Sequence, residues 1–299
     1  KLGGPDDGGG EDTSDGAGDG DEELDPNELK ARAATEKDAT SKALSKNWLY
    51  ASAGMRFTKR DFNVVASNEE TVSYRAVYYP ALDLGAELFP FGMTNADLQA
   101  IGFYLGFRYG ADGFETQRSD GTAVTGAIKH PEFTAGVAIR GENPAKDMDS
   151  DEDPRSRLLL GFRYVNFPVE YTPADDDPTQ APLPSISHLN LTIGGKLAYP
   201  VGVSGLFLTM EAEIIPASFF LEDPLPFGKT YNSYGLSGEM GAIYKFTDAI
   251  GLHVSYGGRV MRANFDGEGI ADFANPADGA TANFIELVQG FSAGLQYHY

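Results

Sequence analysis

Residues Phe284 to Tyr299 read FIELVQGFSAGLQYHY, and along this stretch apolar side chains alternate with small or polar ones. A period of two places alternate residues on opposite faces of an extended strand. One face carries Phe291, Ala293, Leu295, Tyr297 and Tyr299, and the other carries Glu286, Gly290, Ser292, Gly294, Gln296 and His298. The stretch therefore predicts a β-strand with one apolar face. It fits a membrane-spanning barrel and equally an antiparallel sheet that covers a soluble core.

Composition excludes several classes of protein. The chain has 299 residues, 36 of them Gly, and 12% are aromatic. It contains no apolar run of the roughly 18 residues that a membrane helix needs. It also has no cysteine, which excludes disulfides, thiolate metal sites, a cysteine nucleophile and a lipoprotein anchor. The formal charge of -21 argues against nucleic acid as a partner, because phosphate binding needs a basic surface.

The amino-terminal part differs in composition from the rest. Residues 1–26 are rich in Gly, Asp and Glu, which predicts a disordered acidic linker. These acidic residues do not match a helix-loop-helix calcium site, since Leu24 occupies the position where such a loop needs glycine. Residues 27–47 are rich in helix formers and predict a short helical segment. The start at Lys1, without an apolar leader, is expected of a mature form or a fragment.

From Trp48 onward the chain consists of about ten alternating segments separated by Gly-, Pro- and Asp-rich breaks. Several are longer than ordinary soluble strands, and long enough to cross a membrane at a tilt. The segments are 48–60, 72–89, 98–109, 129–140, 157–167, 186–199, 205–219, 231–246, 250–263 and 284–299.

The charges within these segments fall on the more polar parity of each strand. They are Arg75, Asp83, Glu87, Arg108, Arg140, Arg163, Lys196, Glu211, Glu213, Glu239, Lys245, Arg259 and Glu286. An Arg or Lys that faces lipid at mid-membrane costs about 2–4 kcal/mol, so a lipid-facing surface must exclude charge while a lumen can collect it. The first segment is ambiguous, because Arg56 and Lys59 lie on opposite parities. A soluble sheet would carry a denser set of outer charges, so the pattern favours a lumen.

These observations predict an all-β fold: an antiparallel up-and-down transmembrane β-barrel of about ten strands over residues 48–299. Breaks 200–204 and 247–249 are short, whereas breaks 110–128, 168–185 and 264–283 are long. Short periplasmic turns and long outer loops are typical of outer-membrane barrels, so both termini are expected in the periplasm. The long break 141–156 is an exception to this rule.

Aromatic residues gather near the expected inner rim: Tyr50, Phe89, Phe91, Tyr199, Tyr244, Phe246, Tyr297 and Tyr299. With the aromatic carboxyl-terminal strand, this pattern resembles small outer-membrane β-barrels of Gram-negative bacteria, including porin-like ones, over Trp48 to Tyr299. The resemblance implies an outer-membrane location and contact with outer-membrane lipid and lipopolysaccharide. It also implies an assembly signal at Phe291, Leu295, Tyr297 and Tyr299 that the barrel-assembly machinery reads.

A barrel of about ten strands is expected to have a lumen that side chains largely fill. The function predicted is that of a structural or anchoring membrane protein, whose amino-terminal segment reaches a periplasmic partner. The alternative is a narrow channel or transporter for small solutes. Ten-stranded outer-membrane proteases place Asp and His at the outer rim, but here no spacing brings His130 or His188 to an orienting partner, and His253 and His298 fall in the other half. No enzyme activity, cofactor or metal is predicted.

Overall fold

The computed structural model describes residues 48–66, 71–93, 98–117, 123–141, 155–172, 185–221, 229–266 and 281–299. The linker predicted over 1–26 and the helix predicted over 27–47 lie outside these residues. Within the described ranges, no helix has the length and apolar character that a membrane crossing requires.

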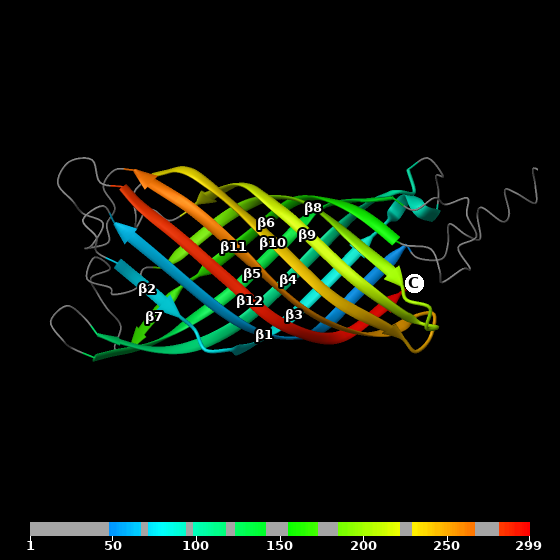
Figure 1. Ribbon diagram of the computed structural model, residues 1–299, viewed down its shortest axis with the longest axis horizontal. Helices are drawn as coiled ribbons and strands as arrows, with labels where there is room; N and C mark the ends of the chain where they lie inside the picture. The colour runs from blue at the N-terminus through cyan, green and yellow to red at the C-terminus, as the bar shows by residue number, and fades with distance from the viewer. Residues whose placement is uncertain are drawn as a thin grey trace, which may run out of the picture. The chain divides into compact units, whose positions relative to one another are not determined.

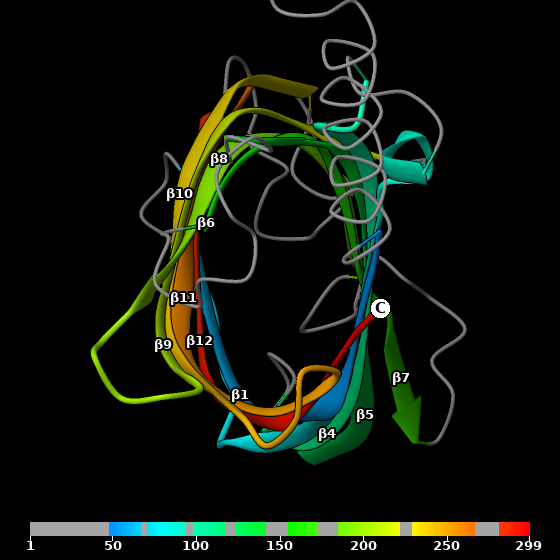
Figure 2. The same cartoon turned by 90° about the vertical axis from the view of Figure 1, so that its right-hand side faces the viewer.

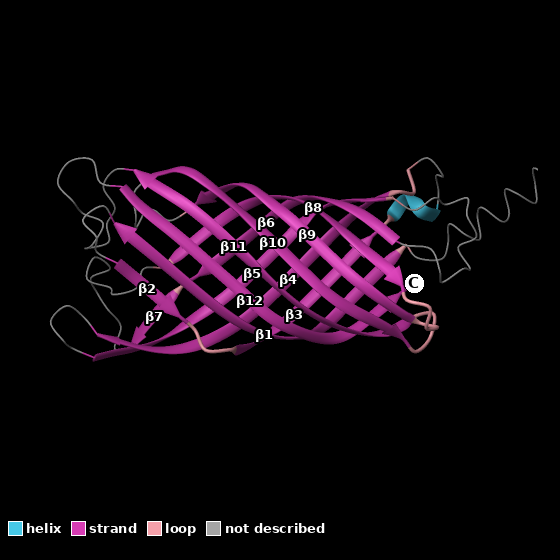
Figure 3. Cartoon of the chain, in the orientation of Figure 1, coloured by secondary structure: helices cyan, strands magenta, loops and turns pink. Residues whose placement is uncertain are grey.

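Twelve strand segments form one antiparallel sheet. They are β1 (Leu49–Ala66), β2 (Thr71–Arg75), β3 (Tyr79–Leu88), β4 (Ile101–Gln117), β5 (Ala123–Arg140), β6 (Arg155–Phe167), β7 (Val169–Thr172), β8 (Ile186–Pro200), β9 (Leu206–Phe220), β10 (Lys229–Lys245), β11 (Ile250–Asp266) and β12 (Thr281–His298). A single 3₁₀ turn, η1 (Pro90–Met93), follows β3 among the described residues. The long strands run obliquely around a common axis (Figures 1 and 3).

The sheet closes on itself because β12 pairs with β1 (Figure 2). At the end of this seam the amide of Leu49 donates to the carbonyl of Tyr299 at 3.1 Å, and the amide of Tyr299 donates back at 2.9 Å. We call the end of the barrel that holds Leu49 and Tyr299 the terminal rim, and the opposite end the loop rim. Closure leaves no sheet edge along the seam, which a membrane-spanning sheet requires.

Two of the barrel strands are interrupted. β2 and β3 both pair with β1, and β6 and β7 both pair with β5, so each pair of segments occupies one position in the wall. The twelve segments thus make a barrel of ten strands. The prediction of an antiparallel up-and-down barrel of about ten strands is confirmed.

Several strands extend further toward the loop rim than the sequence pattern indicated. The break predicted over 110–128 is instead a hairpin in which β4 and β5 stay paired from Ile101–Ile139 to Gln117–Ala123. This segment alternates weakly, since Gly, Ala and Thr are common in it, and backbone pairing does not need large side chains. The predicted contrast between short and long connections is correspondingly reduced on this side.

The outer surface of the barrel is apolar and the inner surface is polar in its middle. Large apolar side chains on every long strand are exposed outward, among them Leu105 at 63%, Leu208 at 50%, Met240 at 65% and Leu295 at 57%. Charged residues on the outer parity, such as Lys59, Lys129 and Arg262, lie in the loop-rim halves of their strands, and Arg75 lies in β2, the loop-rim part of its interrupted strand. A charge-free apolar belt of this kind is the surface that a lipid bilayer covers.

Apolar side chains also fill part of the interior. A cluster toward the loop rim, which we call the aromatic plug, contains Phe62, Val64, Tyr74, Ala76, Tyr79, Ala81, Ile128, Phe167, Ile186, Met261, Ala263, Phe265, Ala282 and Phe284. A smaller cluster toward the terminal rim contains Tyr50, Phe89, Tyr104, Ala138 and Leu159. The charged part of the lumen lies between these two clusters.

Candidate functional site: the charged lumen

Glu132 on β5 is the centre of the lumen network. Arg108 Nη1 on β4 lies 3.0 Å from Glu132 Oε1, and Arg259 Nη1 on β11 lies 2.9 Å from Oε2. Arg163 Nε on β6 lies 3.4 Å from Oε1. One carboxylate therefore joins three arginines from three strands, and it offers enough lone pairs to do so.

Glu286 on β12 forms a second centre, just below the aromatic plug. It accepts a hydrogen bond from Arg60 Nε at 2.6 Å, and Arg259 Nη2 lies 3.4 Å from its other oxygen. His188 Nε2 is 3.8 Å from the same oxygen. The side chain of Glu286 is fully buried, so these partners replace all of its contact with water.

Three further pairs line the middle of the lumen. Arg56 Nη1 donates to Glu239 Oε2 at 2.7 Å, and Ser255 Oγ donates to the other oxygen at 2.7 Å. Arg163 Nη2 donates to Glu213 Oε2 at 2.6 Å. Arg108 Nη2 is 3.3 Å from Asp83 Oδ2. Arg108 and Arg163 each bridge two carboxylates from different strands, and Arg56 joins β1 to β10, so the layer ties several strands of the wall together.

Further cationic side chains lie between this layer and the terminal rim. Arg157 Nε lies 2.7 Å from Glu87 Oε2, and Lys196 Nζ lies 3.5 Å from Glu87 and 3.9 Å from Glu211. Arg140 stands over the ring of Phe89, with Cζ 3.4 Å from the centroid. Contacts of this cation–π type stabilise a cation in a site that is partly desolvated.

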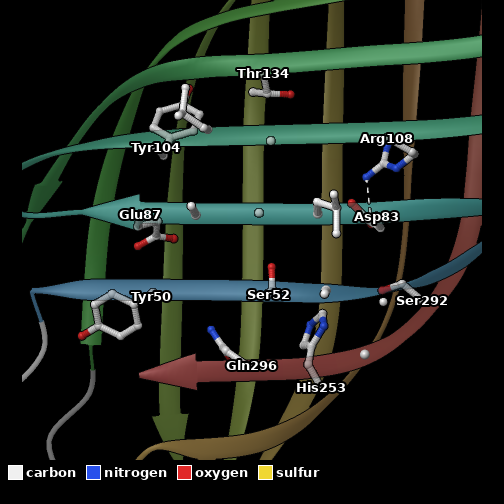
Figure 4. A pocket seen from close by; sticks show the side chains of 18 of the residues that line it. Tyr50, Ser52, Asp83, Glu87, Tyr104, Arg108, Thr134, His253, Ser292 and Gln296 are labelled. Atoms are coloured by element: carbon white, nitrogen blue, oxygen red, sulfur yellow. Dashed lines mark hydrogen bonds and ion pairs between the residues drawn. The ribbon is translucent and has the colours of Figure 1, made fainter. Parts of the chain in front are cut away.

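A polar cavity of about 220 Å³ lies in this half of the lumen (Figure 4). One of its walls carries small inward residues, Ser52, Gly85, Gly106 and Thr134, which are neighbours across β1, β3, β4 and β5. Charged residues that reach the cavity include Asp83, Glu87, Arg108, Glu132, Arg163, Lys196, Glu211, Glu213 and Glu239, together with His253. The space exists because the small residues leave it unfilled.

The structure places most of the predicted lumen charges on the inner face of the wall. These are Asp83, Glu87, Arg108, Arg140, Arg163, Lys196, Glu211, Glu213, Glu239, Lys245, Arg259 and Glu286. Lys245 lies there over the ring of Phe207, 4.8 Å from its centroid.

Arg75 is the exception, and its predicted lumen position is wrong. Its side chain is 81% exposed and its only contact among the described ion pairs is Asp61, at 3.9 Å. Tyr74 of β2 and the following Ala76 point inward, whereas Tyr79 and Ala81 point inward in β3. The irregular residues between β2 and β3 reverse which alternate residues point inward. An inward face assigned by counting from β3 is therefore wrong in β2.

Four lumen residues were not predicted: Arg56, Arg60, Glu132 and Arg157. Glu132 and Arg157 share the parity of Arg140 and Arg163 in their own strands, so a complete reading of the alternation would have found them. Arg56 and Arg60 were hidden by Lys59, which lies on the opposite face of β1, where its Nζ is 3.3 Å from Asp61 Oδ2.

The histidines and the carboxyl-terminal aromatic residues occupy different surroundings. His130 stacks on Tyr79 with centroids 4.4 Å apart, and His188 Nδ1 is 3.0 Å from Asn190 Oδ1. The described residues contain no group of His, Asp or Glu side chains arranged to hold a metal ion. The predicted assembly-signal residues Phe291, Leu295, Tyr297 and Tyr299 are all exposed on the outer face.

Searches against family models and curated proteins give no match. Among solved structures, the chain is similar to the outer membrane protein OprG from Pseudomonas aeruginosa, with 12% identity, a TM-score of 0.33, and coverage of 84% of this chain and 96% of the other. The translocator domain of the autotransporter NalP from Neisseria meningitidis has 13% identity, a TM-score of 0.40 and coverage of 91% and 98%. Neisserial surface protein A has 11% identity, a TM-score of 0.30 and coverage of 85% and 99%. These low similarities transfer no function.

Proposed function

We propose that the chain is an outer-membrane β-barrel whose lumen is closed, and that it acts as a structural or anchoring membrane protein. The observation that carries this proposal is the aromatic plug. Phe62, Phe167 and Phe284 come from three strands and are at most 2% exposed, and the ring centroid of Phe62 lies 5.3 Å from that of Phe167 and 6.0 Å from that of Phe284. Close packing of these rings inside the barrel supports a closed lumen.

The ion pairs of the charged lumen are a second obstacle to a solute, in addition to the aromatic plug. A solute that crossed the lumen would have to separate Glu132 and Glu286 from the arginines around them. Removing one partner from a buried ion pair costs about 3–5 kcal/mol, because the other charge remains without compensation. Two successive obstacles of different chemistry therefore lie on the axis of the barrel.

The orientation is part of the proposal. The connections at the terminal rim include the short turns 201–205 and 246–249, where Gly202 and Gly205 adopt positive φ values of 75° and 76°. Short turns face the periplasm in outer-membrane barrels, which supports a periplasmic position for the terminal rim. A basic surface in the periplasm is the partner that we propose for the acidic residues 1–26. Barrel-assembly machinery and lipopolysaccharide are the expected contacts of the wall itself.

Planar-bilayer recording tests the closed lumen. The purified chain is expected to give no current steps, whereas the triple variant Phe62→Ala, Phe167→Ala and Phe284→Ala should conduct. The matched control replaces three outward aromatic residues, Phe103, Phe133 and Phe162, which are 46–49% exposed on the lipid-facing surface. Current steps from the wild-type chain would contradict closure.

The narrow channel remains the second candidate, and the cavity near the terminal rim is the observation that favours it. If the lumen conducts, Arg108→Ala should change the conductance because Arg108 lines the cavity and contacts Asp83 and Glu132. An unchanged conductance in this variant would place the path elsewhere.

The anchoring role has a separate test. Full-length chain and a variant with the acidic residues of 1–26 changed to Asn and Gln are cross-linked in cells, and the adducts are compared. The role predicts a periplasmic adduct that only the acidic form gives. Identical adduct patterns from the two forms would contradict it.

A further inference from the structure

We propose that the lumen cavity is a binding site for a small organic cation with a primary ammonium group. The cavity is large enough for a ligand, since its volume of about 220 Å³ far exceeds the roughly 10–15 Å³ that one water molecule requires. The proposal does not depend on whether the barrel conducts.

Glu211 is the least compensated charge in the cavity. Its nearest cation is Lys196, whose Nζ is 3.9 Å away and is shared with Glu87 at 3.5 Å. By contrast, Glu213 and Glu239 each accept a hydrogen bond of 2.6 or 2.7 Å from an arginine and another from a serine. Glu211 therefore has acceptor capacity that the described network does not use.

Glu211 stands directly opposite Glu239 in the pairing of β9 with β10, and directly opposite Lys196 in the pairing of β8 with β9. Like charges at directly opposed positions destabilise a sheet, and a cation between them would reverse the sign of that contribution. A bound ammonium ion would thus stabilise the wall that holds it.

A neutral group at the cavity points to the same ligand chemistry. The Oε1 atom of Gln296 is buried without a hydrogen-bond partner among the described residues, and Gln296 lines the cavity from β12 (Figure 4). Glu211 and this amide oxygen both accept hydrogen bonds, so a hydrogen-bond donor suits them. Arg108 Nε and Arg163 Nε also lack a hydrogen bond, but each of these arginines already contacts two carboxylates.

The number and charge of the donors narrow the class of ligand. A primary ammonium group has three N–H donors on one positive centre, so it suits a carboxylate together with a neutral oxygen. A metal ion fits less well, because Ca²⁺ and Mg²⁺ need several oxygen ligands within about 2–2.6 Å and no such group occurs among the described residues. An anion would face the carboxylates, while Arg108 and Arg163 each already contact two of them.

The small-residue wall offers a way to close the cavity without damaging the barrel. A Cβ atom added at Gly106 would meet Thr134 Cβ at 3.4 Å, an ordinary contact, so a leucine there would extend into the cavity. Gly238 provides the matched control, since it is exposed on the outer face of β10, one residue from Glu239, and its nearest neighbour would lie at 3.7 Å. A leucine at Gly238 adds the same side chain on the lipid side.

Calorimetric titration of the detergent-purified full chain tests the site with n-butylammonium as the probe. We expect saturable binding to the wild type and to Gly238→Leu, and at least tenfold weaker binding to Glu211→Gln and Gly106→Leu. Heat-modifiable gel mobility verifies that each variant is folded. Tetramethylammonium, which has no N–H donor, and butyrate are expected to bind at least tenfold more weakly than n-butylammonium.

Several results would overturn the proposal: no saturable binding of n-butylammonium to the wild type, unchanged affinity in folded Glu211→Gln or Gly106→Leu, or equal binding of tetramethylammonium or butyrate. Bilayer recording without amine is a separate measurement. A conducting wild-type chain would contradict the closed-lumen function while leaving the binding result to stand or fall alone.

Discussion

Arg60 and Glu286 form an ion pair across the seam of the barrel, with 2.6 Å between Nε and Oε1. Arg60 belongs to β1 and Glu286 to β12, so the pair joins the first and last strands, and the two side chains are 3% and 0% exposed. Removing the Glu286 carboxylate leaves the Arg60 guanidinium buried without this ion-pair partner. This relationship leads to the first prediction.

Glu286→Gln should lower the free energy of unfolding by about 3–5 kcal/mol, the usual cost of breaking a buried pair from one side. Urea unfolding in lipid vesicles, followed by the fluorescence of Trp48, measures the change. Trp48 is the only tryptophan, and its ring lies 5.5 Å from that of Tyr299 at the seam. The double variant Arg60→Met with Glu286→Leu should be less destabilised than the single one. If Glu286→Gln unfolds like exposed Glu115→Gln, the pair does not stabilise the seam.

Gly294→Ala should impair barrel closure much more than Gly106→Ala. A Cβ atom at Gly294 would lie 2.5 Å from the backbone oxygen of Ala53 on β1, a distance that forces the two strands apart. At Gly106 the nearest atom would be 3.4 Å away, so the extra methyl group fits. The fraction of heat-modifiable, folded protein after refolding into detergent measures closure. Equal yields would show that the seam adjusts to the side chain.

Met240→Arg should destabilise the barrel by about 2–4 kcal/mol, since Met240 is 65% exposed within the apolar belt. Asp266→Arg, at the loop-rim end of β11, is the matched control and should change stability by only about 0–1 kcal/mol. Urea unfolding in vesicles compares the two. A similar small effect at both positions would mean that Met240 does not face the hydrocarbon region.

Tyr74→Phe should loosen the loop-rim end of the wall. β2 pairs with β1 alone, and beyond Gly110 β4 pairs only with β5, so the facing edges of β2 and β4 have no ladder between them in the described part of the chain. The Tyr74 hydroxyl donates to Asp112 Oδ2 at 3.0 Å and bridges these edges. A hydrogen bond contributes about 0.5–1.5 kcal/mol, so amide exchange in β2 should become about two- to tenfold faster. Exchange in β12 is the internal reference, and equal acceleration there would indicate general destabilisation.

The barrel and most of its lumen charges could be predicted from the sequence because period-two alternation is a local property. In β8, β10 and β12, once one residue is known to point inward, the alternation assigns the residues around it to the inner or the outer face. The alternation also revealed the apolar belt, since Leu191, Met240 and Leu295 all fall on the charge-free parity. Residue type and spacing sufficed for these features.

Changes of face within a strand could not be predicted in the same way. The inward set of β9 changes from Glu213 and Ile215 to Ser218, at the register shift beside Pro216, and the residues between β2 and β3 displace Arg75 outward. Such irregularities depend on how neighbouring strands pair, which separate segments do not reveal. The role of Glu132 as a shared acceptor for three arginines likewise depends on the assembled barrel.

The reciprocal hydrogen bonds between Leu49 and Tyr299 also constrain the order of events in biogenesis. The first strand finds its second neighbour only in the last strand, at the other end of the folded chain. Until the ribosome has made that last strand, β1 remains an open edge that could pair with another molecule. The pairing of β12 with β1 therefore removes the last exposed edge of the sheet, and protection of that edge is needed only until this step.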